Sequence, residues 1–328
     1  MTWLTWRQFR VQALSVFAAL AAVVVVLAIT GPDLVGRTSF TDVDFLFGGT
    51  MLLMYLLPAA LGAFWGVPMV ARELETGTHS LVWNQTVTRR RWLATKLGTG
   101  VLAATVAAAL LSVAVTWWAS PIDALASAER QSSMLNRMAP PVFGARGIVP
   151  VGYAVFAFVL GVAAGIVLRR TMAAMAVTLV AFAAVLLAVP FLVRPYVLPP
   201  TDETVPITEQ NLKQIIGDES GVLEAVTVEE PAGAWVLTNE TVDASGDPVR
   251  PLPAEVQHCI PAPGEGEPPD RQSVVTCVSQ LGDLGYQQQL TYQPGSRFWP
   301  LQWMETGLYL LLSAALSWFC FRHLRRLS

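Results

Sequence analysis

The residues of this chain that could take part in chemistry are concentrated in one charged segment, residues 70–97, which reads VARELETGTHSLVWNQTVTRRRWLATKL. The segment places two carboxylates, Glu73 and Glu75, close to a run of arginines and to Lys96. Acidic and basic side chains in this pattern suit recognition of a complementary charged surface. The segment therefore predicts a docking site for a partner, and it lies between two long apolar runs.

Motifs for catalysis are missing from the sequence. It contains no HExxH zinc motif, no GxSxG nucleophile elbow and no GxxxxGK[ST] phosphate loop. The three histidines, His79, His258 and His323, are too widely spread to predict a shared metal site. We therefore expect no enzyme activity, no cofactor and no metal in this chain, so that energy for any vectorial work must come from another subunit.

Composition predicts a membrane protein. Of the 328 residues, 53% are hydrophobic and only 14% are charged, whereas soluble domains carry about 25% charged residues. A transmembrane helix needs about 20 apolar residues. Six segments meet this requirement, near 14–30, 46–69, 97–118, 149–168, 171–193 and 302–321. The aromatic and basic residues before the first run predict an amphipathic N-terminal helix at the membrane surface.

The distribution of arginine and lysine predicts the orientation. The termini and the loops on their side hold twelve basic residues against two acids, Glu73 and Glu75. The short loops on the opposite side hold four basic residues. By the positive-inside rule both termini are cytoplasmic, in a multi-pass protein of the plasma membrane. Glu305, near the outer end of the last span, is the one charged residue expected inside an apolar run.

The long segment 194–298 is then extracytoplasmic. It contains 13 of the 22 prolines and 16 acids. Alternating runs at 224–230, 234–240, 273–279 and 286–292 predict strands, and 207–217 predicts a helix. Cys259 and Cys277 both fall here, which favours a disulfide in an oxidising compartment, with two unpaired thiols as the alternative. The predicted fold class is thus an all-α polytopic membrane protein, formed by residues 1–193 and 299–328. A β-rich α+β domain, residues 194–298, is inserted between the fifth and sixth helices. The alternative for this insertion is an acidic loop without fixed structure.

Local signals divide the charged segment into short helices. The second span is expected to continue as a helix through VARELE, and Gly77 suits the position after its end, where positive φ favours glycine. Thr78 can begin a short surface helix near 78–85 that presents Leu81 and Trp83. Thr86 or Thr88 can cap the helix that starts with RRRW and leads into the third span.

The pattern RELETGT…LVW…VTRRRWLATKL resembles the first cytoplasmic loop of ABC-2 type permeases, and the stretch YQPGSRFWPLQWMETGLYLLL resembles an actinobacterial subgroup of them. The resemblance implies a coupling helix that docks into a separate ABC ATPase, which would bind ATP and Mg²⁺. It assigns this role to Arg72, Glu73, Glu75, Gly77, Thr78, Arg89 and Lys96, and the pattern around them adds Leu81, Trp83 and Arg91. The long segment 194–298 departs from the wider family.

The same resemblance implies a dimer of permease subunits, with a transport path between spans two and five of facing copies. Residues suited to line it are Met51, Met54, Tyr55, Phe64, Trp65, Met172, Met175 and Phe182; lipid contact or core packing is the alternative for each. Two small-xxx-small pairs, Gly62 with Gly66 and Gly161 with Gly165, predict close helix packing within the chain, with a subunit interface as the alternative.

Together these features predict a permease subunit that exports a lipophilic or amphipathic substrate, such as a drug, antibiotic, lipid or peptide. Its partners would be the ABC ATPase, a second permease copy and the lipid bilayer, with no nucleic acid. The alternative is a sensor of the same class, whose extracytoplasmic domain binds a ligand without transport. A membrane enzyme is the third class, but no convergent polar cluster supports it.

Overall fold

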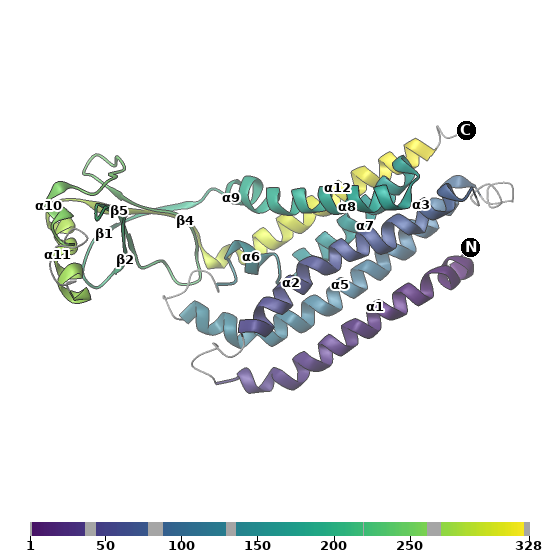
Figure 1. The fold of residues 1–328 in the computed structure, drawn as a ribbon, viewed down its shortest axis with the longest axis horizontal. Coiled ribbons are helices and arrows are strands. Elements are labelled where there is room, and N and C mark those ends of the chain that lie inside the picture. Colours follow the sequence, from purple (N-terminus) through teal and green to yellow (C-terminus); the bar gives the residue numbers. More distant parts are fainter. Residues whose placement is uncertain are drawn as a thin grey trace. The chain divides into compact units, whose positions relative to one another are not determined.

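The computed structural model of the chain describes residues 2–36, 44–77, 88–128, 136–218, 220–260 and 270–324. It divides into two compact units. The first comprises Met1–Leu125, Pro140–Val197 and Phe298–Ser328, and the second comprises Ala126–Ala139 and Leu198–Arg297. The first unit is helical, and the second contains all the strands of the described residues (Figure 1).

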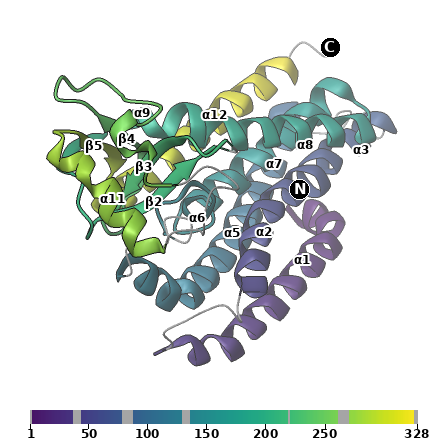
Figure 2. The ribbon, with the colours of Figure 1, turned by 60° about the vertical axis from the view of Figure 1, so that its left-hand side comes forward.

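The helical unit contains the six predicted spans. Among the described residues, six helices are long and apolar enough to cross a bilayer. They are Arg10–Leu34, Phe45–Glu75, Arg89–Ala124, Val149–Leu168, Thr171–Val197 and Gly295–Leu324. Most are longer than the apolar runs alone indicate, because the helices continue into polar sequence at their ends. The start of α1 (Thr2–Thr30), the end of α3 (Val67–Glu75) and the end of α12 (Phe298–Leu324) lie at the same end of this unit (Figures 1 and 2).

Helix α7 (Val149–Leu168) is the centre of this unit. In the most apolar 18-residue stretch of this helix, 78% of the residues are buried, against 17% in the corresponding stretch of the first span. It contacts α12, α8 (Thr171–Ala188) and all three segments of the second span. Those segments are α2 (Asp44–Ala60), the π-helical turn η3 (Leu61–Gly66) and α3.

The two small-residue pairs explain this close approach, as predicted for packing within the chain. A Cβ on Gly62 would lie 2.6 Å from the carbonyl oxygen of Ala157 in α7, and one on Gly161 would collide with the backbone of Gly62. Glycine is therefore needed on both helices, because their backbones touch. The second and fourth spans form one tightly packed pair.

The predicted signals around the charged segment are confirmed at its described edges. Helix α3 ends at Glu75, and Gly77 follows with φ +73°. Thr88 precedes α5 (Arg89–Ala128), and its hydroxyl accepts a hydrogen bond from the Arg91 backbone N–H at 3.3 Å. The predicted surface helix near 78–85, with Thr78, Leu81 and Trp83, lies outside the described residues.

The N-terminal helix is joined to the first span without a break. Helix α1 runs from Thr2 to Thr30 as one element, so the predicted amphipathic helix is the first part of a single long helix. Its far end is held by a hydrogen bond from Trp118 Nε1 to Thr30 Oγ1 at 2.9 Å. The 3₁₀ turn η1 (Pro32–Leu34) follows it directly.

The remaining short helices of the first unit are α6 (Pro140–Phe143), the π-helical turn η4 (Val189–Val193) and α9 (Arg194–Val197). Gln302 of α12 fixes the start of α7, because its Oε1 accepts hydrogen bonds from the backbone N–H groups of Ile148 and Val149. A buried glutamine thus supplies the acceptor that the first turn of a helix otherwise lacks.

The second unit combines two antiparallel sheets with two helices. One sheet has the order β1 (Thr201–Pro206), β5 (Gln287–Gln293), β4 (Trp235–Val242), and the other pairs β2 (Leu212–Gly217) with β3 (Leu223–Val228). In the central strand β5, Gln289 lies opposite Thr204 of β1 on one side and opposite Glu240 of β4 on the other. Helices α10 (Ala254–Gln257) and α11 (Arg271–Asp283) and the 3₁₀ turn η5 (Gly295–Arg297) complete the unit.

Two predicted elements of this unit are wrong. Residues 273–279, predicted as a strand, belong to helix α11, and residues 212–217 of the predicted helix form strand β2. In α11 the core positions Val274, Val278 and Leu281 follow the helical period, which outweighs the β-branched residues. Strand β2 forms because it pairs with β3, which follows it directly in the chain, and this pairing outweighs the local helical pattern.

The predicted disulfide between Cys259 and Cys277 is confirmed. It joins the end of α10 to α11 at the edge of a core built from Ile207, Leu223, Val226, Leu252, Val256, Val278 and Leu281. Cys320, in α12, is a buried free thiol.

The N-terminus of α11 gives a pH prediction. Asp270 accepts hydrogen bonds from the Ser273 hydroxyl and from the Ser273 backbone N–H, which lower the pKa of this carboxyl below its ordinary value of 3.8. The cap therefore stabilises α11 at neutral pH, and its contribution disappears as the pH falls through the lowered pKa. In Asp270→Ala we expect faster amide exchange than in the wild type over the first turn of α11 at pH 7, with the difference vanishing in strong acid.

Hydrogen-exchange mass spectrometry of the full chain, corrected for intrinsic rates, measures this difference. Gln272→Ala, on the same turn but without the capping role, serves as the control. An Asp270→Ala effect that is as large in strong acid as at pH 7 would contradict the role of the ionised carboxylate.

Candidate functional site

The first acid of the charged segment is bound within the chain. Glu73 Oε1 pairs with Lys96 Nζ at 2.7 Å, and Glu73 Oε2 accepts a hydrogen bond from Trp92 Nε1 at 3.2 Å. Lys96 also donates to the carbonyl oxygen of Met69 at 2.6 Å, and its side chain is only 6% exposed. These contacts join the end of the second span to the start of the third.

The second acid joins the same end of α3 to the fifth span. Glu75 Oε2 accepts hydrogen bonds from the Thr171 hydroxyl at 2.6 Å and the Thr171 backbone N–H at 3.1 Å. A carboxylate at a helix N-terminus satisfies a free N–H and interacts favourably with the helix dipole. Glu75 thus caps α8 from outside that helix.

Through these two acids, the end of α3 in the second span is bonded to both the third and the fifth spans. A shift of α3 along or across its axis would pull on Lys96 in α5 and on Thr171 in α8 together. We call Glu73, Glu75, Lys96, Trp92 and Thr171 the junction. The loop predicted to dock on a partner leaves directly from it.

The arginines predicted for coupling lie around the junction. Arg72 and Arg91 are exposed, and Arg89 is half-buried. Glu73 and Lys96, in contrast, pair with each other and hold the helices together. Gly77 ends the described part of this side of the loop.

A groove of about 420 Å³ opens beside the junction. Its walls come from α1, the second span and the start of α8. The lining residues are Gln12, Ser15, Val16, Leu57, Ala60, Leu61, Phe64, Trp65, Pro68, Arg72, Thr171 and Met175. The groove unites three residues of the predicted transport path, Phe64, Trp65 and Met175, with Arg72 and Thr171.

The other predicted path residues lie elsewhere. Tyr55 and Phe182 belong to an aromatic cluster around Tyr153, with ring centroids 6.2 and 6.5 Å from it. Met54 is buried, Met51 is half-buried, and Met172 is 79% exposed. The structure of one chain therefore gathers part of the predicted path in the groove and uses the rest in packing or on the surface.

A comparison with known protein families agrees with this layout. Residues 35–194 match the family described as ABC-2 membrane transporter related. This region is that of an ABC-2 type permease. The family is a membrane component of ABC transporters and implies an ATPase partner. No curated protein and no solved structure matches the chain.

The permease holds a second polar site, which sequence reasoning did not find. Arg194 and Glu305 form an ion pair, with Arg194 Nε 2.7 Å from Glu305 Oε2 and Arg194 Nη2 3.1 Å from Glu305 Oε1. Their side chains are 1% and 4% exposed. Tyr153 donates to Glu305 Oε1 at 2.9 Å, and the guanidinium lies over the Phe143 ring at 4.2 Å.

This site links the fifth span to the fourth and sixth. Arg194 directly follows the π-helical turn η4, and Glu305 belongs to α12. One signal was present: a lone acid in an apolar run calls for a buried partner. Arg194 was assigned to the outer loop, so the pair was missed. The family match ends at Arg194, and its partner lies beyond the matched residues.

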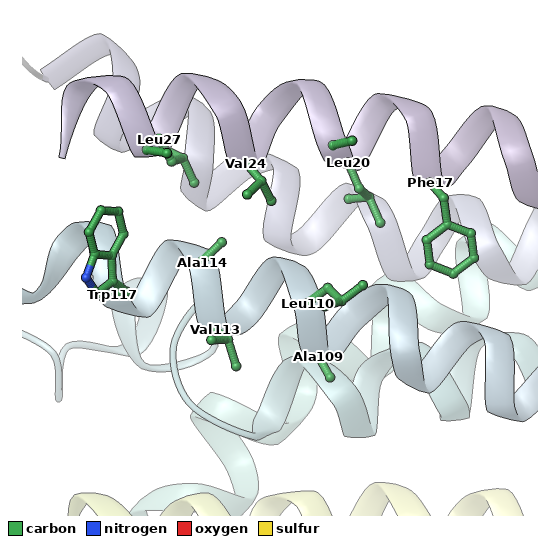
Figure 3. Close-up of a pocket in the computed structure, with 11 residues that line it drawn as sticks. Phe17, Leu20, Val24, Leu27, Ala109, Leu110, Val113, Ala114 and Trp117 are labelled. Carbon is green, nitrogen blue, oxygen red and sulfur yellow. The ribbon is translucent and has the colours of Figure 1, made fainter.

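A different groove, of about 690 Å³, separates α1 from α5 in the permease (Figure 3). Its lining is apolar throughout, from Phe17, Leu20, Val24 and Leu27 on one helix to Leu110, Val113 and Trp117 on the other. Apart from the indole N–H of Trp117, no lining side chain carries a polar group. This groove matches the chemistry of lipid tails.

Proposed function

We propose that the chain is the permease subunit of an ABC exporter, driven by ATP that a separate nucleotide-binding subunit hydrolyses. The cargo is lipophilic or amphipathic. The observation that supports this function best is the junction, because it mechanically ties the loop predicted to dock on the ATPase to three membrane spans.

The proposed coupling runs through this junction. ATP binding closes two ATPase subunits and moves the docked loop 78–87. Glu73 and Glu75 pass this displacement to α5 and α8, because their hydrogen bonds and the ion pair join the helices within about two turns of their ends. A rigid-body shift of these helices is a common form of switching. The groove at the junction is then remodelled with each ATP cycle.

The proposed assembly contains two permease copies and two ATPases in the plasma membrane, with ATP and Mg²⁺ bound by the ATPases. Both termini and the docking loop face the cytoplasm, because the basic residues gather there. Residues 194–298 face outward, and the disulfide Cys259–Cys277 suits an oxidising compartment.

A charge reversal on the docking surface tests the function. In the double variant Trp83→Ala/Arg91→Glu we expect ATP hydrolysis by the reconstituted complex to lose its dependence on the permease, with at least a tenfold weaker association, which is about 1.4 kcal/mol. Arg91 is exposed, so the fold should persist. The measurements are co-purification with the cognate ATPase and ATPase rate in proteoliposomes.

The control is Arg271→Glu, the same charge reversal at an exposed position of the second unit. It should leave association and ATPase rate unchanged. If the docking variant binds and stimulates the ATPase like the wild type, the coupling role fails. A complex that hydrolyses ATP in response to an external ligand but moves no cargo would favour the sensor.

A further inference from the structure

The groove beside the junction has the two-part chemistry of an amphiphile site. Arg72 and Thr171 lie at the end nearest the junction, where α3 ends and α8 begins, and α1 adds the polar residues Gln12 and Ser15. From Arg72 the apolar wall extends back along the second span to Leu57. At a rise of about 1.5 Å per residue, the 15 steps from Leu57 to Arg72 cover about 22 Å, which suits an extended hydrocarbon chain.

The charge at the polar end is positive. Arg72 is the one charged residue that lines the groove, and its guanidinium forms no ion pair within the described part of the chain. Glu75 lies nearby, but both donors of Thr171 bind its carboxylate and the charge of Arg170 acts on it. The carboxylate of Glu75 thus already has hydrogen-bond and charge partners, and Arg72 remains available for an anion.

The apolar end can hold a flexible chain. Phe64 is 58% exposed, so its ring can move to cover a ligand. Trp65 is only 2% exposed, so its ring is a fixed part of the wall. The volume of about 420 Å³ falls within the range of small-molecule sites, about 300–1,000 Å³, and suits one hydrocarbon chain rather than two. No charged residue lines the groove between α1 and α5.

We propose that this groove binds a single-chain anionic amphiphile, with its acidic head at Arg72 and its tail against Phe64 and Trp65. Basic pockets between membrane helices are known to bind acidic lipid heads. The ligand enters from the bilayer, because the groove is open and its apolar part lies within the span. This assignment rests on the proposed function where it names the ligand as the class of cargo.

Native mass spectrometry of the full chain in detergent provides the test, with palmitoyl lysophosphatidylglycerol and palmitoyl lysophosphatidylcholine as probes. We expect the wild type to bind the anionic probe about tenfold more tightly than the zwitterionic one, as one charged contact allows. Arg72→Gln should remove this preference, and Phe64→Ala should weaken both probes equally. Arg90→Gln, an exposed arginine outside the groove, should keep the preference.

Equal binding of both probes by the wild type, or an Arg72→Gln variant that behaves like Arg90→Gln, would overturn the assignment. Displacement of the probe by millimolar inorganic phosphate would also overturn it, because the site would then hold a bare anion. The binding assay contains no ATPase. Head-group selectivity without ATP-driven release would therefore leave the groove assignment intact and remove the proposed export function.

Discussion

Replacing Glu305 with leucine should destabilise the permease by about 3–5 kcal/mol, because the change leaves a guanidinium buried without its carboxylate. Arginine cannot escape this cost by losing its proton. Arg194 is 1% exposed at its side chain and has both Glu305 oxygens as partners, so little water can replace them. Chemical unfolding of the full chain in detergent micelles measures the loss.

The double variant Arg194→Met/Glu305→Leu distinguishes a broken pair from a disrupted core. Removing both charges leaves no buried charge unpaired, and only the Tyr153 hydroxyl loses its Glu305 acceptor. Apolar replacements of a buried pair are often neutral. We expect the double variant to be more stable than Glu305→Leu alone. The exposed pair Arg250–Glu224, with side chains 66% and 33% exposed, is the matched control, and Arg250→Met there should cost about 0–1 kcal/mol. A Glu305→Leu variant as stable as this control would contradict the importance of the buried pair.

Gly62→Ala should destabilise the helical unit by about 1–3 kcal/mol, although alanine is the better helix former. The new Cβ would lie 2.6 Å from the Ala157 carbonyl oxygen, so the second and fourth spans would have to separate. The thermal midpoint of the purified chain should fall accordingly.

Gly98→Ala is the control, and we expect the opposite sign. A Cβ on Gly98, in the third span, meets no other atom within 4 Å. The same substitution there should stabilise the helix by about 0.5–1 kcal/mol, because only the conformational entropy of glycine is removed. Equal effects at the two positions would mean that the backbone contact between the second and fourth spans does not limit stability.

The sequence allowed the elements with local signals to be predicted. Six apolar runs are six helices, Gly77 ends α3 with positive φ, and Thr88 begins α5. The paired cysteines were also predictable, because both fall in one long segment that the charge distribution predicts to be extracytoplasmic. These features depend on neighbouring residues or on composition, which a single sequence displays.

Features that depend on distant partners were not predictable. Arg194 meets Glu305 across 111 positions. Residues 126–139, between the third and fourth spans, belong to the second unit, where Asn136 donates to the carbonyl oxygen of Ala234 at 2.8 Å. Of the candidate site, the charged segment was identified, but the roles of Glu73 and Glu75 within the chain appear only when Lys96, Trp92 and Thr171 are placed beside them.

The ion pair Arg194–Glu305 also bears on how such a chain can vary. The inserted stretch Leu198–Arg297 leaves the helical unit shortly after Arg194 and returns shortly before Glu305. This ion pair joins the helical segment before the insertion to the helical segment after it. The two ends of the insertion are therefore held close together. Loop-closure entropy changes only slowly with length. In evolution, the inserted segment can therefore be lengthened, shortened or exchanged while the helical unit keeps its fold.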